Sequence, residues 1–293
     1  MEGGFGMKPE NSAKRKNFRV LSISSGKGGV GKTLITVNLA YALRDEGNEI
    51  LIIDGNFGNG NVEVMCKALP EVSMYDVLSG SHPIKEALLE ISKGIKIIPA
   101  GTGIYEISEP DVSQKLSLLS ALDTIDHVAD IVIIDTPTGI SSNAMFFNTS
   151  VTEIILVSTP EITSIVNTLS SINVLHKKFG EKEFKLVVNM VESEDEAIST
   201  YDIIYEQTQS FFDLNLHFCG YVPFAKEIRD SIRYLETPCT FPKGGAMENV
   251  FRSLARKILV SEPEETTRKG QQFFAKRVLK EEHDRTISQS EGV

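Results

Sequence analysis

The stretch RVLSISSGKGGVGKT, from Arg19 to Thr33, joins an apolar run to a glycine-rich loop. The loop fits the pattern G-x-x-x-x-G-K-[S/T] and lies between a predicted strand, Arg19–Ser24, and a predicted helix near 33–47, which is the setting of a phosphate-binding loop. Glycine lets consecutive backbone N–H groups point at phosphates, and the start of the helix adds partial positive charge. Lys32 is expected to reach the β- and γ-phosphates, and the Thr33 hydroxyl to ligate Mg²⁺. The predicted cofactor-binding residues of this loop are Gly28, Gly29, Val30, Gly31, Lys32 and Thr33.

Short apolar runs alternate with helical patterns from about residue 18 to residue 260. Most runs are continuously apolar, as expected for strands that are covered on both faces. This alternation predicts an α/β fold with a doubly wound, mostly parallel sheet and helices on both faces. The predicted strands are Arg19–Ser24, Glu49–Asp54, Ile95–Pro99, Ile131–Asp135, Glu153–Ser158, Phe184–Asn189 and His217–Val222, and the predicted helices lie near 33–47, 111–128, 161–179, 195–212, 225–236 and 246–260.

The chain divides into three parts. Residues 1–17 have no apolar core, so they are predicted to be a disordered arm rather than a secretory signal. Residues 18–260 form the predicted P-loop domain. Residues 261–293 begin with the acidic, proline-containing segment SEPEETT, which is typical of a linker, and continue into a short helical pattern.

Composition excludes several classes of protein. With 41% hydrophobic and 24% charged residues, the 293-residue chain has the make-up of a soluble globular protein. Its net charge of −10 argues against a protein that coats nucleic acid. The three cysteines are far apart and have no histidines at ligand spacing, so neither a disulfide framework nor a zinc site is expected. No apolar stretch approaches the roughly 18 to 20 residues of a membrane span.

Lys27 is not required by the general loop pattern, and it carries a resemblance. The segment KGGVGKT (Lys27–Thr33) resembles the deviant phosphate loop of the MinD/ParA family, the SIMIBI class of P-loop ATPases. In that family the early lysine crosses a dimer interface to the partner's nucleotide. The resemblance therefore implies a homodimer with ATP sandwiched at its interface, and a catalytic role for Lys27.

Further segments extend this resemblance over about residues 18–260. They are DIVIIDTPTGI (Asp130–Ile140), LVVNMV (Leu186–Val191) and VPFAKEIRDSI (Val222–Ile232). The resemblance implies that Asp135 is held near Mg²⁺ through water and that the loop at 136–139 senses the γ-phosphate. It also implies that Asn189 hydrogen-bonds the adenine and that Pro223 belongs to an element that closes over the base.

Within the family, two segments are most similar to the FlhG/FleN (YlxH) branch of flagellar-number regulators. They are DGNFGNGN and, near the carboxyl terminus, GQQFFAKRVL (Gly270–Leu279). This implies a role in flagellar number or placement. The amino-terminal arm lacks the DQAxxLR element with which that branch stimulates its GTPase partner FlhF. An FlhF-like GTPase, another flagellar regulator, and a MinD-like role with another cargo all stay open as a result.

The family resemblance makes Asp54 the first carboxylate of a D-x-D element, and Asn56 stands where the second is expected. In the family the first carboxylate organises the waters of Mg²⁺, and the second orients the attacking water. An amide does neither as well as a carboxylate, but phosphoryl transfer depends mainly on positioning, so slow ATP hydrolysis is predicted. The alternative is that Asn56 is a neutral loop residue and other groups place the water. The predicted catalytic residues are Lys27, Lys32, Asp54 and Asn56, and the predicted metal residues are Thr33, Asp54 and Asp135.

The segment RKGQQFFAKRVLKEE has the pattern of a short basic amphipathic helix. Phe274, Val278 and Leu279 fall on one side of a helical wheel, and Phe273 lies beside that stripe. We predict that these four residues bind a membrane surface reversibly, which would place a cytoplasmic protein peripherally at the inner face of the cell membrane. The alternative is that the helix folds back onto the domain.

Three other functions compete with the dimerising switch. A ParA-type DNA-partitioning ATPase is disfavoured by the sequence pI near 5.1. A metabolic or redox enzyme on the same scaffold lacks the cysteine arrangement of a nitrogenase-type reductase or a readable substrate pocket. An ATP-binding scaffold that barely hydrolyses is favoured by Asn56.

Overall fold

The computed structural model describes residues 18–101, 109–234 and 244–260. The predicted arm at 1–17 and the predicted linker and amphipathic helix at 261–293 lie outside these residues.

An eight-stranded sheet with the order β3-β4-β2-β5-β1-β6-β7-β8 forms the centre of the fold. Strand β3 is antiparallel to β4, and every other neighbouring pair is parallel. The chain winds outward from β1 in both directions, which confirms the predicted α/β, mostly parallel architecture. The strands are β1 (Arg19–Ser24), β2 (Ile50–Asp54), β3 (Leu89–Ser92), β4 (Ile95–Ile98), β5 (Ile131–Asp135), β6 (Glu153–Ser158), β7 (Glu183–Val191) and β8 (Asn215–Pro223).

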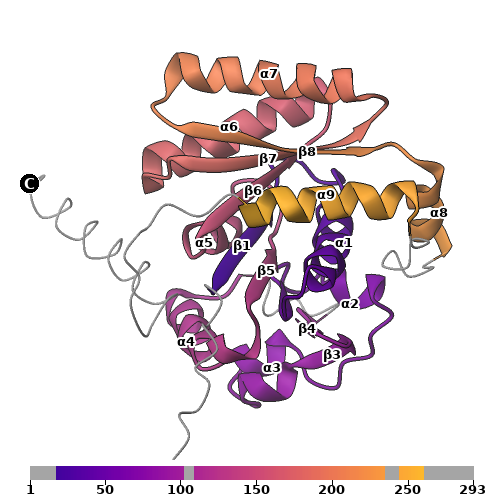
Figure 1. Cartoon of the computed structure of the whole chain (residues 1–293). Helices are drawn as coiled ribbons and strands as arrows, with labels where there is room; N and C mark the ends of the chain where they lie inside the picture. The colour runs from indigo at the N-terminus through magenta and orange to yellow at the C-terminus, as the bar shows by residue number, and fades with distance from the viewer. Residues whose placement is uncertain (1–17, 102–108, 235–243, 261–293) are drawn as a thin grey trace, which may run out of the picture.

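Helices cover both faces of this sheet. One face packs against α1, α2, α8 and α9, and the other against α3 to α7, so two apolar cores lie on opposite sides of the strands. Figure 1 shows α6 and α7 above the sheet, and α9 passing beside α1, with which it is in contact. The helices are α1 (Lys32–Asp45), α2 (Val62–Met65), α3 (Met74–Leu78), α4 (Val112–Asp123), α5 (Ser142–Thr149), α6 (Ile162–Phe179), α7 (Glu194–Phe211), α8 (Lys226–Tyr234) and α9 (Ala246–Val260), with 3₁₀ turns at Ile84–Ala87 and Asp126–Val128.

Several short elements are absent from the sequence prediction. Strand β3 is half-exposed at the end of the sheet, and an edge strand does not need the continuous apolar run by which the buried strands were predicted. Helix α5 is buried at seven of its eight positions, so it has no solvent-exposed face to produce an amphipathic pattern. The predicted helix near 111–128 is shorter than expected, because α4 ends at Asp123 and a 3₁₀ turn follows.

The amino ends of the strands carry a buried ionic cluster. Arg19 begins β1 and donates to both carboxylate oxygens of Glu153, which begins β6, at 2.7 Å each. The same guanidinium donates to the carbonyl of Ile258 in α9 at 2.8 Å, and Lys185 of β7 also pairs with Glu153. The cluster thus fastens the last turn of α9 to the sheet.

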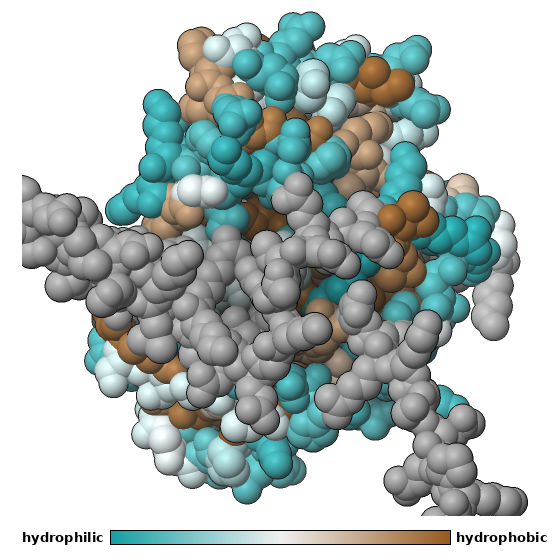
Figure 2. All heavy atoms as spheres, turned by 60° about the vertical axis from the view of Figure 1, so that its left-hand side comes forward, coloured by the Kyte–Doolittle hydropathy of each residue, from teal (hydrophilic) through white to brown (hydrophobic). Residues whose placement is uncertain are grey.

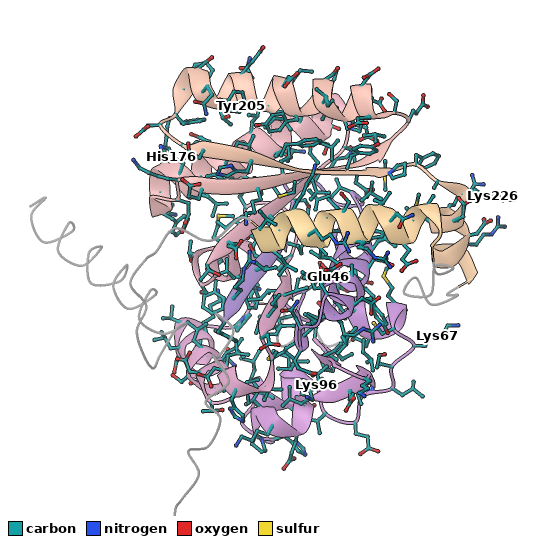
Figure 3. The ribbon with its side chains drawn as sticks, in the orientation of Figure 1. Glu46, Lys67, Lys96, His176, Tyr205 and Lys226 are labelled. Atoms are coloured by element: carbon teal, nitrogen blue, oxygen red, sulfur yellow. The ribbon has the colours of Figure 1, made fainter. Side chains whose placement is uncertain are left out.

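The surface offers a different kind of ion pair. Arg256 of α9 donates to Glu46 at 2.8 Å, and Figure 3 shows Glu46 just below α9. Outside the area covered by grey atoms, the face turned forward in Figure 2 is mostly hydrophilic, with separate hydrophobic patches. Among the described helices, none has both the length and the hydropathy to cross a bilayer.

Candidate nucleotide-binding site

The phosphate loop connects β1 to α1 at the carboxyl end of the central strand. Gly31 precedes α1 with a φ of 92°, a conformation that side chains with a Cβ rarely adopt, and a Cβ there would overlap the amide of Asn189. A Cβ on Gly26 would overlap the carbonyl of Asn167 in α6. No described side chain caps α1, and its first turn carries no acidic residue. Its first N–H groups and its partial positive charge therefore suit an anion such as a phosphate.

Lys32 is buried and held between two hydroxyl groups. Its Nζ donates to Ser25 Oγ at 2.9 Å and to Thr138 Oγ1 at 2.8 Å. Burial lowers the pKa of Lys32 below its ordinary value, and the charge of Asp135 opposes that shift. The Lys32 ammonium, which is predicted to bind the phosphates, thus lies beside the phosphate loop. Sequence reasoning missed its partner Ser25, although this residue directly precedes the motif.

Thr33 and Asp135 form the part of the site that suits a divalent cation. The Thr33 hydroxyl donates to one Asp135 carboxylate oxygen at 2.6 Å, and Thr36 donates to the other at 3.2 Å. Burial raises the pKa of Asp135 to about 6. These hard oxygen atoms fit Mg²⁺, which needs only one or two protein oxygens when substrate phosphates and waters complete its shell. Thr33 would ligate the ion, and Asp135 would orient Thr33 and the ion's waters.

Asp54 lies opposite Asp135 in the register of β2 and β5. Its carboxylate accepts backbone N–H groups from Asn56 at 3.0 Å, Asn61 at 2.8 Å and Val62 at 3.0 Å. Burial raises the pKa of Asp54 well above its usual range, and the charge of Asp135 adds to that effect. Asp54 therefore fixes the loop at 55–62, and its predicted part in organising the metal's waters stays a prediction.

Asn56 uses its amide as a donor inside that loop. Its Nδ2 donates to the carbonyl of Asn59 at 2.7 Å, and Asn61 Nδ2 donates to the same carbonyl at 3.0 Å. An aspartate at this position could not donate, since an ionised carboxylate only accepts hydrogen bonds. Asn56 thus has a structural contact of its own, and its effect on hydrolysis stays a prediction.

The predicted base-binding residues lie at the ends of β7 and β8. Asn189 is 2% exposed and donates from Nδ2 to the Val30 carbonyl at 2.6 Å, so it braces the phosphate loop. Pro223 ends β8 opposite Val191. The residue that follows each of them is exposed: Met190, after Asn189, has a φ of 60° and is 39% exposed, and Phe224, after Pro223, is 63% exposed. Contact of Asn189 and Pro223 with an adenine stays a prediction.

Lys27 points away from the buried part of the loop. Its Nζ pairs with Glu161, the residue that precedes α6, and both side chains are partly exposed. The hydrogen bond and charge of Lys27 lower the pKa of Glu161. No local sequence pattern indicates this pairing, because the two residues are 134 positions apart. The predicted membrane residues Phe273, Phe274, Val278 and Leu279 lie outside the described residues.

Comparisons with known proteins agree with this geometry. Residues 16–259 match the ParA family, described as NUBPL iron-transfer P-loop NTPase. The antiactivator FleN of Pseudomonas aeruginosa is 30% identical over 241 residues, 82% of this chain and 86% of FleN. The flagellum site-determining protein YlxH of Helicobacter pylori is 25% identical over 269 residues, 90% of each chain. The solved structure of the septum site-determining protein MinD of Pyrococcus horikoshii, complexed with Mg-ADP, has a TM-score of 0.69 at 25% identity, and the match covers 82% of this chain and 96% of MinD.

The family match spans the phosphate loop and both acidic strand ends, and the solved MinD shares the arrangement of the sheet. The predicted recognition and fold class are thus confirmed. The chain belongs to the ParA/MinD family of P-loop NTPases, a family of ATPases.

Proposed function

We propose that this chain is an ATP-dependent dimerising switch with slow ATP hydrolysis that acts in the control of flagellar number or placement. Two molecules close on two Mg·ATP, the closed pair recruits a partner, and hydrolysis separates it. The flagellar role is supported by the relatives FleN, an antiactivator, and YlxH, a flagellum site-determining protein.

The observation that carries the proposal is the position of Lys27. The phosphate loop has two lysines, and only Lys32 turns into the buried site, toward Ser25 and Thr138. Lys27 lies at the surface with Glu161. A surface lysine at the mouth of a phosphate loop is available to the nucleotide of a second molecule. This agrees with the role that the family resemblance gives it.

Slow hydrolysis is supported by the contacts of Asn56. Its amide is directed at the carbonyl of Asn59 within the loop. An amide cannot take a proton from an attacking water, and the loss of a general base typically costs about 10² to 10⁴ in rate. We therefore propose that ATP hydrolysis is slow and that the ATP-bound pair is long-lived as a result.

Dimerisation is tested by size-exclusion chromatography with light scattering, in Mg²⁺ with ADP, ATP or a non-hydrolysable ATP analogue. We expect a monomer with ADP and a dimer with the analogue. Lys27→Ala should stay monomeric in both. Lys93→Ala is the matched control, because Lys93 is an exposed lysine in the turn between β3 and β4. A wild-type chain that stays monomeric with the analogue would exclude the switch.

The hydrolysis rate is tested with Asn56→Asp. We expect this variant to turn over ATP faster than the wild type, because a carboxylate can orient the attacking water. Asn59→Asp adds the same charge at an exposed position of the same loop and serves as the control. Equal turnover by the wild type and Asn56→Asp would show that Asn56 does not limit the rate.

A second candidate is an ATP-binding scaffold that barely hydrolyses, and the loop-directed amide of Asn56 is the observation that favours it. The two candidates separate in a single-turnover experiment. The switch predicts that bound ATP becomes ADP and that the dimer then separates, whereas the scaffold predicts that ATP stays intact in a lasting complex.

Membrane attachment concerns the predicted helix near the carboxyl terminus. We propose peripheral attachment at the inner face of the cell membrane through the predicted helix with Phe273, Phe274, Val278 and Leu279. Sedimentation with anionic liposomes in the presence of ADP or the analogue tests it. Binding only with the analogue is expected, since a dimer offers two helices at once.

A further inference from the structure

Ser25 lies between the end of β1 and the phosphate loop, and it is completely buried, with 0% exposure. Its Oγ accepts a hydrogen bond from the Lys32 ammonium at 2.9 Å. The same hydroxyl donates its own proton to the backbone carbonyl of Lys27 at 2.8 Å. One buried hydroxyl thus joins the side chain of one lysine of the loop to the backbone of the other.

The direction of both hydrogen bonds is fixed by the partners of Ser25. A backbone carbonyl can only accept and an ammonium can only donate, whereas a hydroxyl has one proton and two lone pairs. The proton of Ser25 is used on the carbonyl of Lys27, so its lone pairs are left for the ammonium of Lys32. The phosphate loop therefore orients Ser25 as an acceptor.

The backbone around Ser25 is confined as well. Its carbonyl accepts from the N–H of Gly139 at 2.8 Å. The next residue, Gly26, lies so close to α6 that a Cβ there would overlap the carbonyl of Asn167. Since both neighbours restrict this stretch, the hydroxyl of Ser25 cannot shift unless the phosphate loop moves with it.

The ammonium that Ser25 holds keeps one donor for a ligand. A lysine ammonium has three N–H donors, and Lys32 uses one on Ser25 and one on the exposed Thr138. Among the residues that the structure describes, none accepts from the third. A donor that is already in place before a charged ligand arrives needs little reorganisation when the ligand binds.

We propose that Ser25 is a positioning residue for nucleotide binding. Its hydroxyl holds the ammonium of Lys32 at the place where the phosphates bind, and it makes no contact with the nucleotide itself. The inference deepens the proposed function, because it rests on the proposed binding of a nucleotide at this loop.

The first test measures the affinity of the full chain for ADP in Mg²⁺ by calorimetric titration, which does not require a dimer. We expect Ser25→Ala to bind ADP about 10-fold more weakly, the usual effect of one hydrogen bond to a charged group. Ser25→Cys fills the same space with a weak acceptor and should lose nearly as much. Ser22→Ala is the matched control, because Ser22 is an equally buried serine of β1 that donates to Asn148. Its affinity should stay within about twofold of the wild type.

The second test asks whether Ser25 acts through Lys32. The affinity for ADP is measured for Lys32→Ala and for the double variant with Ser25→Ala, at ADP concentrations raised to suit the weaker binding. Two residues that act as a unit give effects that do not add. We therefore expect the two variants to differ by less than about twofold.

Four results would overturn the inference. A 10-fold loss on adding Ser25→Ala to Lys32→Ala would show that Ser25 shapes the loop without Lys32. Wild-type affinity of Ser25→Ala or Ser25→Cys would show that the hydroxyl is not needed. An equal loss in Ser22→Ala would show a general effect of changing buried serines. A wild-type chain that does not bind ADP would end both this inference and the proposed function.

The inference and the dimerising switch can also fail separately. If ADP binding depends on Ser25 through Lys32 as expected, and the chain stays monomeric with the ATP analogue, the inference holds and only the switch is excluded.

Discussion

Two clusters of buried charge lie at opposite ends of the same sheet. At the amino ends of the strands, Glu153 is shared by Arg19 and Lys185, and both of its oxygens are used. At the carboxyl ends, Asp54 and Asp135 lie side by side, and the charge of the Lys32 ammonium acts on Asp135.

The clusters differ in how fully the chain itself compensates their charge. The carboxylate at the amino end is matched by cations, and its arginine also binds the end of α9. Burial raises the pKa of both carboxylates at the other end, and the charge of Asp135 raises the pKa of Asp54 further. Groups whose pKa values are shifted by burial and by like charge gather at functional sites. The comparison indicates that the first cluster serves stability, whereas the second is built for a ligand that brings a cation and phosphates.

The largest expected effect is at the amino end. Arg19→Met leaves Glu153 with one cation and removes the bond to α9, so we expect the free energy of unfolding to fall by about 3 kcal/mol or more. Urea unfolding measures this change. Arg256→Met is the control, because Arg256 pairs with Glu46 at the surface and should cost less than about 1 kcal/mol. Similar losses in both variants would remove the distinction between the two kinds of pair.

Lys32→Ala tests the opposite end. It should lower ATP turnover by about 10² to 10³, the usual effect of losing one donor to a developing charge. The unfolding free energy should hold or rise, because an ammonium that is costly to bury is removed. Steady-state kinetics and urea unfolding on the same preparation check both parts. If Lys32→Ala lost as much stability as Arg19→Met, Lys32 would serve the stability of the fold, as the cluster at the amino end does.

The pKa of Asp135 predicts a pH dependence of the protein without nucleotide. Its folded-state pKa of about 6 lies above the ordinary aspartate value of 3.8, so the folded state holds this proton more tightly than the unfolded state. The stability from this group is full below about pH 4 and is lost as the pH rises to about 6, on the order of 3 kcal/mol.

Urea unfolding of the wild type and Asp135→Asn from pH 4 to pH 7 isolates this contribution. The wild type should lose stability relative to the variant as the pH rises through that window. Affinity for Mg²⁺ with an ATP analogue should change in the opposite sense and rise with pH, because a metal needs the ionised carboxylate. Parallel stability curves for the two proteins would contradict the shifted pKa.

The smallest expected effect is at the rim of the site. Glu161→Gln frees Lys27 from its partner in the same chain. The concentration of nucleotide or protein at half-maximal dimerisation should therefore fall by up to about fivefold, the size expected for an exposed ion pair. Sedimentation velocity with the ATP analogue measures the shift. Asp213→Asn is the control, because it breaks an exposed pair with Lys182 near the amino ends of β7 and β8, away from the phosphate loop. Weaker dimerisation of Glu161→Gln would instead assign Glu161 to the interface itself.

The success of the sequence prediction depended on the kind of pattern. Strands β1, β2, β5 and β6 were predicted because they are buried along their whole length and read as apolar runs. Strand β3 and helix α5 lack such a signature, since one is a half-exposed edge and the other is buried on all sides. Among the site residues, Lys32 and Thr33 followed from the phosphate-loop motif, and Asp135 and the loop at 136–139 followed from the family resemblance. Glu161 had no assigned role.

The sequence by itself determined the phosphate loop, the alternation of strands and helices, and the acidic strand ends, because each is encoded in residues that are adjacent along the chain. Only the tertiary structure decided which residues meet. Lys27 with Glu161, Lys32 with Thr138, and Asp54 beside Asp135 each bring together residues more than 80 positions apart. Such contacts depend on the order and register of the strands, which arise from packing both faces of the whole sheet and leave no trace in any local pattern.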